Sequence, residues 1–274
     1  MVIGKGIKAS EGSMEAQVNL PGSFCWVELA SSDVKAARKF YTDLFAWSVE
    51  EDPMDESPPY IRFQLRGLDV AALYQIEPGP PNAVSDHWGA YISVDDVDAA
   101  AARAAELGGT IVTPPFDVMS AGRLAILKDP QGAIFSLWQA RDHCGVMIKG
   151  EPGSLCWSEL LTDDPTGAVK FYSELFGWEA VSADMPDGPY TSFFRSDSPE
   201  CGMMTLQVEW GEVVPHWVVY FAVADCDAAV ERSSELGATL IVPATDVPDV
   251  GRFAWLRDPV GAVFGIIQLA DTIA

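Results

Sequence analysis

Two glutamate–histidine pairs are the residues of this sequence whose types and spacing could do chemistry. Glu28 and His87 recur in a second copy as Glu159 and His216. A carboxylate beside an imidazole can transfer protons as a general acid–base pair, can anchor a polar ligand, or can be a structural hydrogen-bonded pair. The same side chains could also hold a metal ion in a displaced site. Two of the chain's three histidines stand at this repeated position, a match that duplication alone also explains.

Aromatic residues accompany the first pair. Alternation along a strand places Phe24, Trp26 and Glu28 on one face. Antiparallel pairing with the strand that carries His87 and Tyr91 would then bring Glu28 close to His87. The corresponding residues of the second copy are Glu159, His216, Trp157 and Tyr220. The sequence therefore predicts two concave sites in which Glu and His anchor or transform a small organic molecule between Trp and Tyr walls.

The elements that must position these residues form a long repeat. Residues 22–139 are read again at 153–268, so that Gly-Ser-Phe-Cys-Trp-Val-Glu-Leu from Gly22 returns as Gly-Ser-Leu-Cys-Trp-Ser-Glu-Leu from Gly153. Two copies of this length indicate two homologous domains in tandem, whereas short periods would indicate a solenoid. We predict an N-terminal arm at 1–21, module 1 at 22–140, a mostly polar linker at 141–152 and module 2 at 153–269.

Each module is predicted to contain two halves with the same order of elements. Hydrophobic periodicity and helix-start signals give these elements. The predicted strands of module 1 lie near 24–29, 60–65, 71–75, 87–94, 110–113, 124–127 and 134–139, and its helices begin at Ser31–Asp33 and at Asp95 or Asp96. In module 2, Asp164-Pro165 supplies the helix cap and a first-turn proline. A strand, a helix and three strands are thus expected four times per chain.

Composition and charge exclude several classes of function. The 274 residues are 49% hydrophobic and carry a formal net charge of −23, which favours a folded protein and opposes binding to nucleic acid or anionic membranes. No run reaches the roughly 18 apolar residues that span a bilayer, and the N-terminus lacks the apolar core of a secretion signal. The five cysteines form no C-x-x-C pair, which favours a reducing cytoplasm. A monomer and a homodimer are both compatible with the sequence.

Three motifs occur in the same order in both copies. They are Phe-Tyr-x-x-Leu-Phe from Phe40 and Phe171, Val-x-Asp from Val94 and Val223, and Asp-Pro-x-Gly-Ala from Asp129 and Asp258. Together they resemble the vicinal oxygen chelate superfamily of glyoxalases, bleomycin-resistance proteins and ring-cleaving dioxygenases, over about residues 22–269. The resemblance implies an α+β fold of two tandem modules, each of two βαβββ units that form a curled mixed sheet, or cup, with helices on the outside.

The resemblance also implies where a divalent metal would bind, and those positions lack suitable donors. In module 1 they fall on Trp26, Gly89 and Ser136. In module 2 they fall on Trp157, Val218 and Gly265. Because such ions require His, carboxylate or thiolate ligands, we expect no metal cofactor. The alternatives are a metal-dependent lyase, isomerase or dioxygenase whose ligands have moved to the Glu/His pairs, and a scaffold whose cups are filled by their own side chains.

Three further residues are candidate ligand contacts. Arg123 and Arg252 would place a cation at the rim of each cup for an anionic ligand, but in so acidic a protein pairing with surface acids is favoured. Ser136 stands where the family's glutamate ligand would be. We therefore expect a cytoplasmic, glyoxalase-like protein that binds a small organic ligand for sequestration, sensing or a metal-independent transformation.

Overall fold

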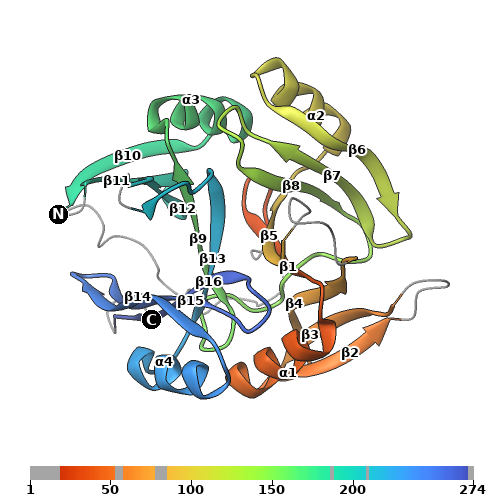
Figure 1. Cartoon of the computed structure of the whole chain (residues 1–274). Helices are drawn as coiled ribbons and strands as arrows, with labels where there is room; N and C mark the ends of the chain where they lie inside the picture. The colour runs from red at the N-terminus through yellow and green to blue at the C-terminus, as the bar shows by residue number, and fades with distance from the viewer. Residues whose placement is uncertain (1–18, 53–57, 78–84, 186–187, 208–209, 271–274) are drawn as a thin grey trace.

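Each sequence repeat forms one curled sheet of eight strands (Figure 1). The computed structural model describes residues 19–52, 58–77, 85–185, 188–207 and 210–270. The strand order is β2-β3-β4-β1-β5-β8-β7-β6 in module 1 and β10-β11-β12-β9-β13-β16-β15-β14 in module 2. The predicted α+β fold with two tandem modules is confirmed.

The elements of module 1 follow the order that the repeat predicts. They are β1 (Phe24–Ser31), α1 (Val34–Phe45), β2 (Ser48–Asp52), β3 (Tyr60–Leu65), β4 (Leu68–Gln75), β5 (His87–Ser93), α2 (Val97–Glu106), β6 (Thr110–Val118), β7 (Gly122–Lys128) and β8 (Ile134–Ala140). Only β2 was given no residues by the sequence analysis, because its largely exposed, charged residues carry no hydrophobic alternation.

Module 2 repeats these elements in the same order. They are β9 (Leu155–Thr162), α3 (Pro165–Phe176), β10 (Glu179–Met185), β11 (Gly188–Arg195), β12 (Ser198–Thr205), β13 (His216–Ala222), α4 (Cys226–Glu235), β14 (Thr239–Val247), β15 (Gly251–Arg257) and β16 (Val263–Leu269). Within the described part of the chain, no helix is both long and apolar enough to cross a membrane.

Aspartate caps fix where the helices begin. The Asp33 carboxylate accepts a hydrogen bond from the Ala36 N–H, and Asp164 does the same for Gly167 ahead of Pro165. Asp96 and Asp225 cap α2 and α4 in the same way. Each cap satisfies one of the backbone donors that a helix leaves unpaired in its first turn, so the sequence identifies these starts correctly.

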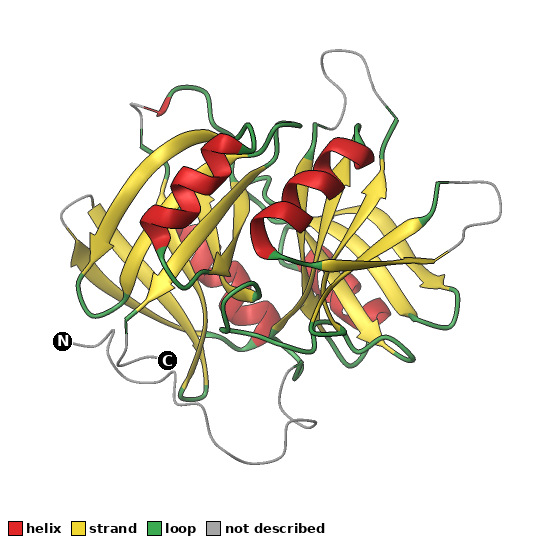
Figure 2. Ribbon diagram, turned by 90° about the horizontal axis from the view of Figure 1, so that it is seen from below, coloured by secondary structure: helices red, strands yellow, loops and turns green. Residues whose placement is uncertain are grey.

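The two modules share one apolar interior. Figure 1 shows α2 beside α3 at one end of the molecule and α1 beside α4 at the other, and Figure 2 shows the α1–α4 pair from below, so each helix lies next to a helix of the other module. The Trp47 indole donates to the Gly153 carbonyl at 2.7 Å, and the Trp178 indole donates to the Gly22 carbonyl at 2.8 Å. Each module makes the same hydrogen bond to the other, as expected for two modules related by a pseudo-twofold axis.

The segment predicted as a linker packs against module 1. Residues 141–149, called the strap from here on, begin at the β6–β7 turn, where the His143 N–H donates to the Ala121 carbonyl. The strap then reaches β1 and β4, where the Val146 N–H donates to the Cys25 carbonyl at 2.8 Å and the Met147 N–H to the Asp69 carbonyl at 2.9 Å. The strap is therefore part of module 1's packing.

Candidate functional site

A partly buried carboxylate, Glu28, lies on the concave face of module 1, held by two phenols and an indole. The Tyr91 and Tyr60 hydroxyls donate to different oxygens of Glu28 in short hydrogen bonds. The Trp26 indole N–H lies 3.1 Å from Glu28 Oε1 and 3.1 Å from the Tyr60 hydroxyl. Strands β1, β3 and β5 thus bring together groups from distant parts of the chain.

Module 2 contains the same cluster with one more indole. The Tyr220 hydroxyl donates to Glu159 Oε2 at 2.6 Å, and the Trp157 indole donates to the Tyr190 hydroxyl at 3.1 Å. The Trp255 indole donates to the Tyr220 hydroxyl at 2.5 Å. Glu159 is only 5% exposed. We call these two arrangements the carboxylate–phenol clusters.

Gly202 leaves space for the Tyr190 side chain to reach Glu159. In the sheet register, Gly202 of β12 lies opposite Glu159 of β9. A Cβ atom at Gly202 would lie 1.8 Å from the Tyr190 hydroxyl oxygen, so the phenol crosses the sheet directly over this glycine. In module 1 the equivalent position is Ala72, and the Tyr60 hydroxyl reaches Glu28 beside it, so only module 2 carries its phenol this close to the strand backbone.

Burial sets the electrostatics of both clusters. Desolvation raises the pKa of Glu28 and of Glu159 above the ordinary value of 4.5, and the tyrosine hydrogen bonds partly oppose this rise. Burial also raises the pKa of Tyr91 and Tyr220 well above 10, so both phenols stay protonated donors at neutral pH. Such a carboxyl group is suited to hold a proton or to accept a hydrogen bond from a ligand hydroxyl.

The raised pKa makes the stability of the protein depend on pH. A group whose pKa is higher in the folded state contributes stability that is complete below its unfolded pKa and is lost as pH rises through the folded value. Glu159→Gln mimics the protonated carboxyl. We therefore expect the variant and the wild type to have the same free energy of unfolding at about pH 4, and the variant to become increasingly more stable than the wild type toward pH 8. Urea unfolding across this range measures the difference, with the exposed Glu231→Gln as control, and a gap that does not change with pH would contradict it.

The predicted Glu/His pairing is replaced by glutamate–tyrosine pairing. The register of β1 and β5 sets Glu28 opposite Gly89 and sets His87 opposite Ala30. His87 lies at the rim with its Nδ1 2.8 Å from the Ser85 carbonyl oxygen. In module 2, Glu159 likewise faces Val218. The predicted register was wrong by two residues, because Glu28 pairs with Gly89 where the prediction placed it beside His87.

The second histidine behaves in the same way. His216 pairs with Leu161 rather than with Glu159, and its Nδ1 is 2.8 Å from the Val214 carbonyl oxygen. Burial lowers the pKa of His216, which favours its neutral form. Both predicted catalytic histidines therefore lie at strand starts on the rims of the cups.

A β-bulge also corrects the predicted strand face. The register of β1 shifts between Phe24 and Trp26, so these two residues lie on opposite sides of the sheet. Phe24 packs between the modules with its ring centroid 4.9 Å from that of Trp217, while Trp26 faces the cup. An extra residue in one strand breaks the alternation on which the prediction rested.

The remaining predicted contacts lie at the edges of the cups or within the sheet. Arg123 donates to Asp98 at 2.6 Å and to Asp117 at 2.9 Å, and Arg252 makes the equivalent ion pairs with Asp227 and Asp246. These pairs correspond to the alternative that the acidic composition favoured. Ser136 is buried opposite Tyr91, in line with Trp26 across the sheet.

Sequence reasoning missed the second phenol of each cluster. Tyr60 and Tyr190 stand on β3 and β11, far along the chain from the glutamates that they contact. One signal could have found them, because both follow a proline at the same place in the repeat, as Pro59-Tyr60 and Pro189-Tyr190. Trp255 carries no such signal, since module 1 has Ile126 at the corresponding position.

The cups do not offer the donor set that the family's metal requires. The strand register aligns Trp26 with Tyr91 and Ser136 in module 1, so Tyr91 rather than the expected Gly89 lies between the other two implied positions. Each cluster supplies a single carboxylate already bound by phenol donors. Among the residues that the structure describes, no three His, Cys, Asp or Glu side chains are grouped as a metal site. These residues do not fit the ion.

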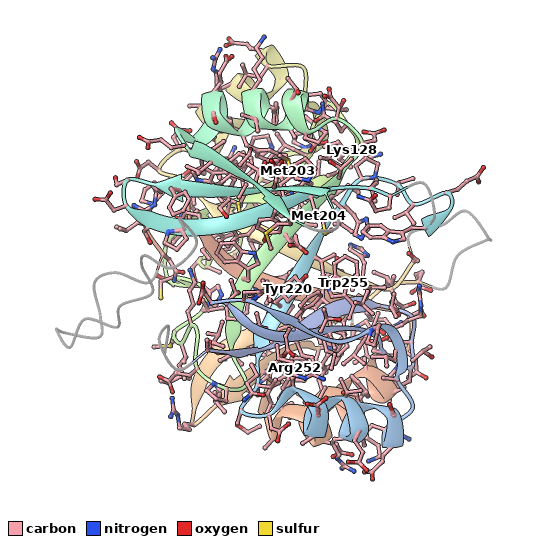
Figure 3. All side chains as sticks on the ribbon, turned by 90° about the vertical axis from the view of Figure 1, so that its left-hand side faces the viewer. Lys128, Met203, Met204, Tyr220, Arg252 and Trp255 are labelled. Atoms are coloured by element: carbon pink, nitrogen blue, oxygen red, sulfur yellow. The ribbon has the colours of Figure 1, made fainter. Side chains whose placement is uncertain are left out.

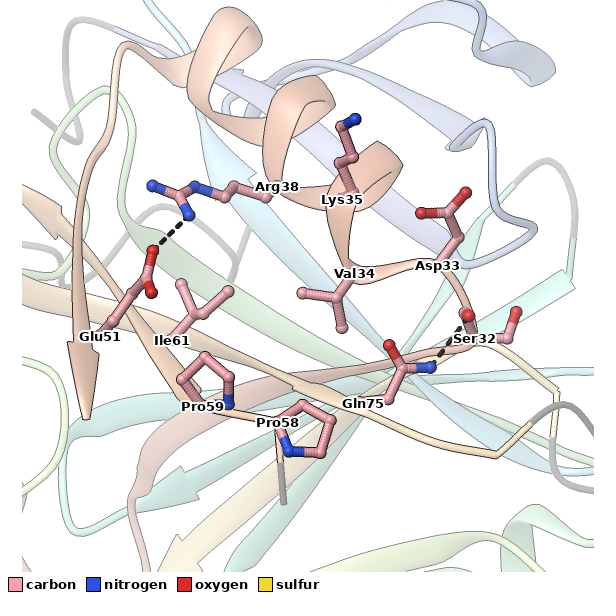
Figure 4. A pocket seen from close by; sticks show the side chains of 10 residues that line it. All are labelled: Ser32, Asp33, Val34, Lys35, Arg38, Glu51, Pro58, Pro59, Ile61 and Gln75. Carbon is pink, nitrogen blue, oxygen red and sulfur yellow. Dashed lines mark hydrogen bonds and ion pairs between the residues drawn. The ribbon is translucent and has the colours of Figure 1, made fainter. Parts of the chain in front are cut away.

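Surface hollows lie at the first turns of two helices. One of about 360 Å³ lies at the first turn of α1, lined by residues that include Lys35, Arg38 and Glu51 (Figure 4). Another of about 280 Å³ lies at the equivalent turn of α3. Their charged or proline-rich rims contain no residue of a carboxylate–phenol cluster. We place the candidate site at the clusters, because those hold the buried titratable groups.

Comparison with known proteins assigns both modules to one family. Residues 23–137 and 151–266 each match the family described as the Glyoxalase/Bleomycin resistance protein/Dioxygenase superfamily. The chain therefore belongs to this superfamily, as the sequence motifs predict.

Two relatives and two solved structures show how far the likeness extends. The chain is 39% identical over 246 residues to "Putative glyoxylase CFP32" of Mycobacterium tuberculosis, covering 89% of this chain and 94% of that protein. It is 37% identical over 264 residues to "Anthracycline biosynthesis protein DnrV" of Streptomyces peucetius, covering 92% of this chain and 94% of that protein.

The Mn(II)-bound glyoxalase from Novosphingobium aromaticivorans has a TM-score of 0.64 at 16% identity, over 90% of this chain and 82% of that one. The 2,3-dioxygenase LapB from Pseudomonas sp. KL28 has a TM-score of 0.63 at 14% identity, over 90% and 93%. At such identities the solved structures show the fold alone.

Proposed function

We propose that this protein binds a small, partly aromatic organic molecule bearing a hydroxyl group, without the family's metal. The observation that carries the proposal is the carboxylate–phenol cluster found in both modules. In each, a glutamate that is partly buried (Glu28) or buried (Glu159) has a raised pKa and lies among Tyr and Trp side chains. A ligand hydroxyl can replace a tyrosine as the donor to the carboxylate, and the indoles and phenols offer flat apolar surface to a ring.

The name of one relative supports an aromatic ligand. This relative is named for anthracycline biosynthesis. The mycobacterial relative is named a putative glyoxylase. The Trp and Tyr side chains of the clusters favour an aromatic ligand over a small aliphatic one, because an aliphatic ligand would leave several of these rings without a stacking partner.

Calorimetric titration with 2-naphthol tests this function, with naphthalene as the matched probe that lacks the hydroxyl. We expect 2-naphthol to bind more tightly than naphthalene. The double variant Glu28→Gln/Glu159→Gln should weaken 2-naphthol binding by about tenfold or more, since a hydrogen bond to a charged group contributes about 1.5–3 kcal/mol. Undiminished affinity in the double variant would refute the role of the clusters.

Metal dependence is tested on the same protein. We expect 2-naphthol affinity to survive dialysis against a chelator and to be unchanged by added Mn(II) or Fe(II), since the cups lack the donors that such ions need. Binding that appears only after metal is added back would favour the alternative of a metal-dependent enzyme with displaced ligands.

A further inference from the structure

We propose that the attachment of the strap to module 1 depends on pH, because the neutral imidazole of His143 holds the strap in place and protonation of this imidazole loosens it. The inference goes beyond the proposed function, since it concerns the conformation of residues 141–149 and needs no ligand. Three observations carry it, namely the contacts of His143, an unpaired nitrogen of its ring and the charges that face the ring.

His143 joins the strap to module 1 through both its backbone and its ring. Its N–H donates to the Ala121 carbonyl at 3.0 Å, and its carbonyl accepts the Trp138 indole N–H at 3.0 Å. Its ring centroid lies 4.4 Å from that of Trp26 and 6.1 Å from that of Trp138, both in edge-on arrangements. Trp26 is only 2% exposed. The packing of the strap on this face therefore depends on the state of the His143 ring.

One nitrogen of this ring is left unpaired by the fold. The His143 Nε2 atom is buried and has no hydrogen-bond partner among the residues that the structure describes. A neutral imidazole can carry its proton on Nδ1, which leaves Nε2 as a bare acceptor. An imidazolium carries a proton on both nitrogens, so Nε2 would become a buried, charged donor without an acceptor, which costs far more free energy. The packed strap therefore favours the neutral ring.

The charged groups that face the ring do not compensate for this cost. Burial lowers the pKa of His143 below the ordinary value of 6.5, Asp69 of β4 and Asp52 of β2 oppose the fall, and Arg62 of β3 adds to it. Both carboxylates are already paired with Arg62 at 2.7 Å. Other charged groups of the neighbouring elements are likewise held in hydrogen bonds or ion pairs, namely Glu28, Asp117 and Arg141. In the strap itself, the neighbours Asp142 and Cys144 are exposed.

The sign of the pH dependence follows from the lowered pKa of His143. A basic group whose pKa is lower in the packed state contributes stability that is complete above its ordinary pKa and is lost as pH falls toward the packed value. The strap should therefore be fully attached above about pH 6.5 and loosen below it. The other end of the strap is held separately, because the Lys149 ammonium donates to the Phe24 carbonyl. We therefore expect the loosening to be local.

Module 2 provides an internal comparison. Trp157, the counterpart of Trp26, is only partly buried, and among the described ring contacts none joins it to a histidine. Figure 3 looks onto this module, where the Trp255 indole donates to the Tyr220 hydroxyl at 2.5 Å. The module's own histidine, His216, has its Nδ1 2.8 Å from the Val214 carbonyl oxygen. A histidine packed on the first-strand tryptophan is thus a feature of module 1 within the described chain.

Hydrogen exchange read by mass spectrometry at about pH 7.5 and about pH 5 tests the proposal. Four strap N–H groups donate to module 1 carbonyls and report on attachment, namely those of Arg141, His143, Val146 and Met147. After correction for the intrinsic exchange rate at each pH, we expect the protection of the strap to fall several-fold at the lower pH. Each pKa unit by which packing lowers the value for His143 changes the release equilibrium tenfold.

Two variants separate His143 from other titrating groups. His143→Phe keeps a flat ring against Trp26 but takes up no proton, so protection of its strap should differ by no more than about twofold between the two pH values. His216→Phe is the matched control, because burial also lowers the pKa of His216, and its strap should respond to pH as in the wild type. NMR titration of the wild type is an independent readout, since the chain has three histidines and His143→Phe identifies the His143 signal.

The outcomes decide the proposal in either direction. Protection lost at the lower pH in the wild type and in His216→Phe, but kept in His143→Phe, supports it, as does a measured His143 pKa below 6.5. An unchanged strap in the wild type, or equal loss in His143→Phe, would overturn it, the second by assigning the effect to a carboxyl group. A His143 pKa at or above 6.5 would also overturn it, because the tryptophan rings would then stabilise the imidazolium. Equal loss of protection throughout module 1 would show global unfolding and contradict local loosening.

Discussion

Asp258→Ala should lower the free energy of unfolding by about 3–4 kcal/mol, a large effect for one residue. Asp258 is 4% exposed, and its Oδ1 accepts the backbone N–H groups of Val260, Gly261 and Ala262 at 2.8–3.0 Å. Its Oδ2 accepts the Tyr41 hydroxyl of the other module at 2.9 Å. Alanine would leave these donors without partners in the interior, and each buried donor left unpaired costs about 1–3 kcal/mol before the backbone relaxes.

Hydrogen bonding accounts for the stabilising effect of Asp258, because its two carboxyl oxygens accept four hydrogen bonds, while burial raises the pKa of this carboxyl. Asp258→Asn keeps one oxygen for the turn and should cost only about 1 kcal/mol. Urea unfolding should rank Asp258→Ala as the least stable, Asp258→Asn next, and the exposed control Asp95→Ala within about 0.5 kcal/mol of wild type. Asp129→Ala should match Asp258→Ala, since Asp129 accepts the Tyr172 hydroxyl in the reciprocal position. Equal stability of the alanine variants and Asp95→Ala would contradict this account.

Gly145→Ala should detach the strap and lower the free energy of unfolding by about 2–4 kcal/mol. Gly145 has φ +97°, and a Cβ atom there would lie 2.1 Å from the Cys25 carbonyl oxygen. The neighbouring carbonyl belongs to the backbone of β1 and accepts the Val146 N–H, so the strap rather than the sheet must move. Moving the strap breaks this hydrogen bond and exposes Val146 and Trp26.

Gly150→Ala is the matched control, because Gly150 also has a positive φ, +76°, but has nothing within 4 Å of its would-be Cβ. It should show only the conformational cost of a left-handed residue, about 1–2 kcal/mol. Hydrogen exchange read by mass spectrometry should show lost protection at residues 141–149 in Gly145→Ala and not in Gly150→Ala. If both variants keep a protected strap, close approach to β1 is not what requires a glycine at position 145.

Local chemistry allowed the sequence by itself to determine much of this protein. The duplicated segment, the aspartate caps at Asp33 and Asp164 and the Asp-Pro-x-Gly turns are short-range patterns, and they correctly identify two modules, the helix starts and the superfamily. The lack of metal donors at the family's positions is also a property of residue identity, and it led to the metal-free proposal.

The tertiary structure alone decided which groups meet. One β-bulge places Phe24 and Trp26 on opposite faces of the sheet. The strand register differs by two residues from the predicted one, so Glu28 accepts a hydrogen bond from Tyr91 and does not contact His87. The sequence names these side chains but cannot rank pairings that differ by a small shift, because that shift is chosen by packing across several strands at once. The strap shows the same limit, since residues 141–149 were predicted as a linker, and their hydrogen bonds to β1 and β4 exist only in the folded chain.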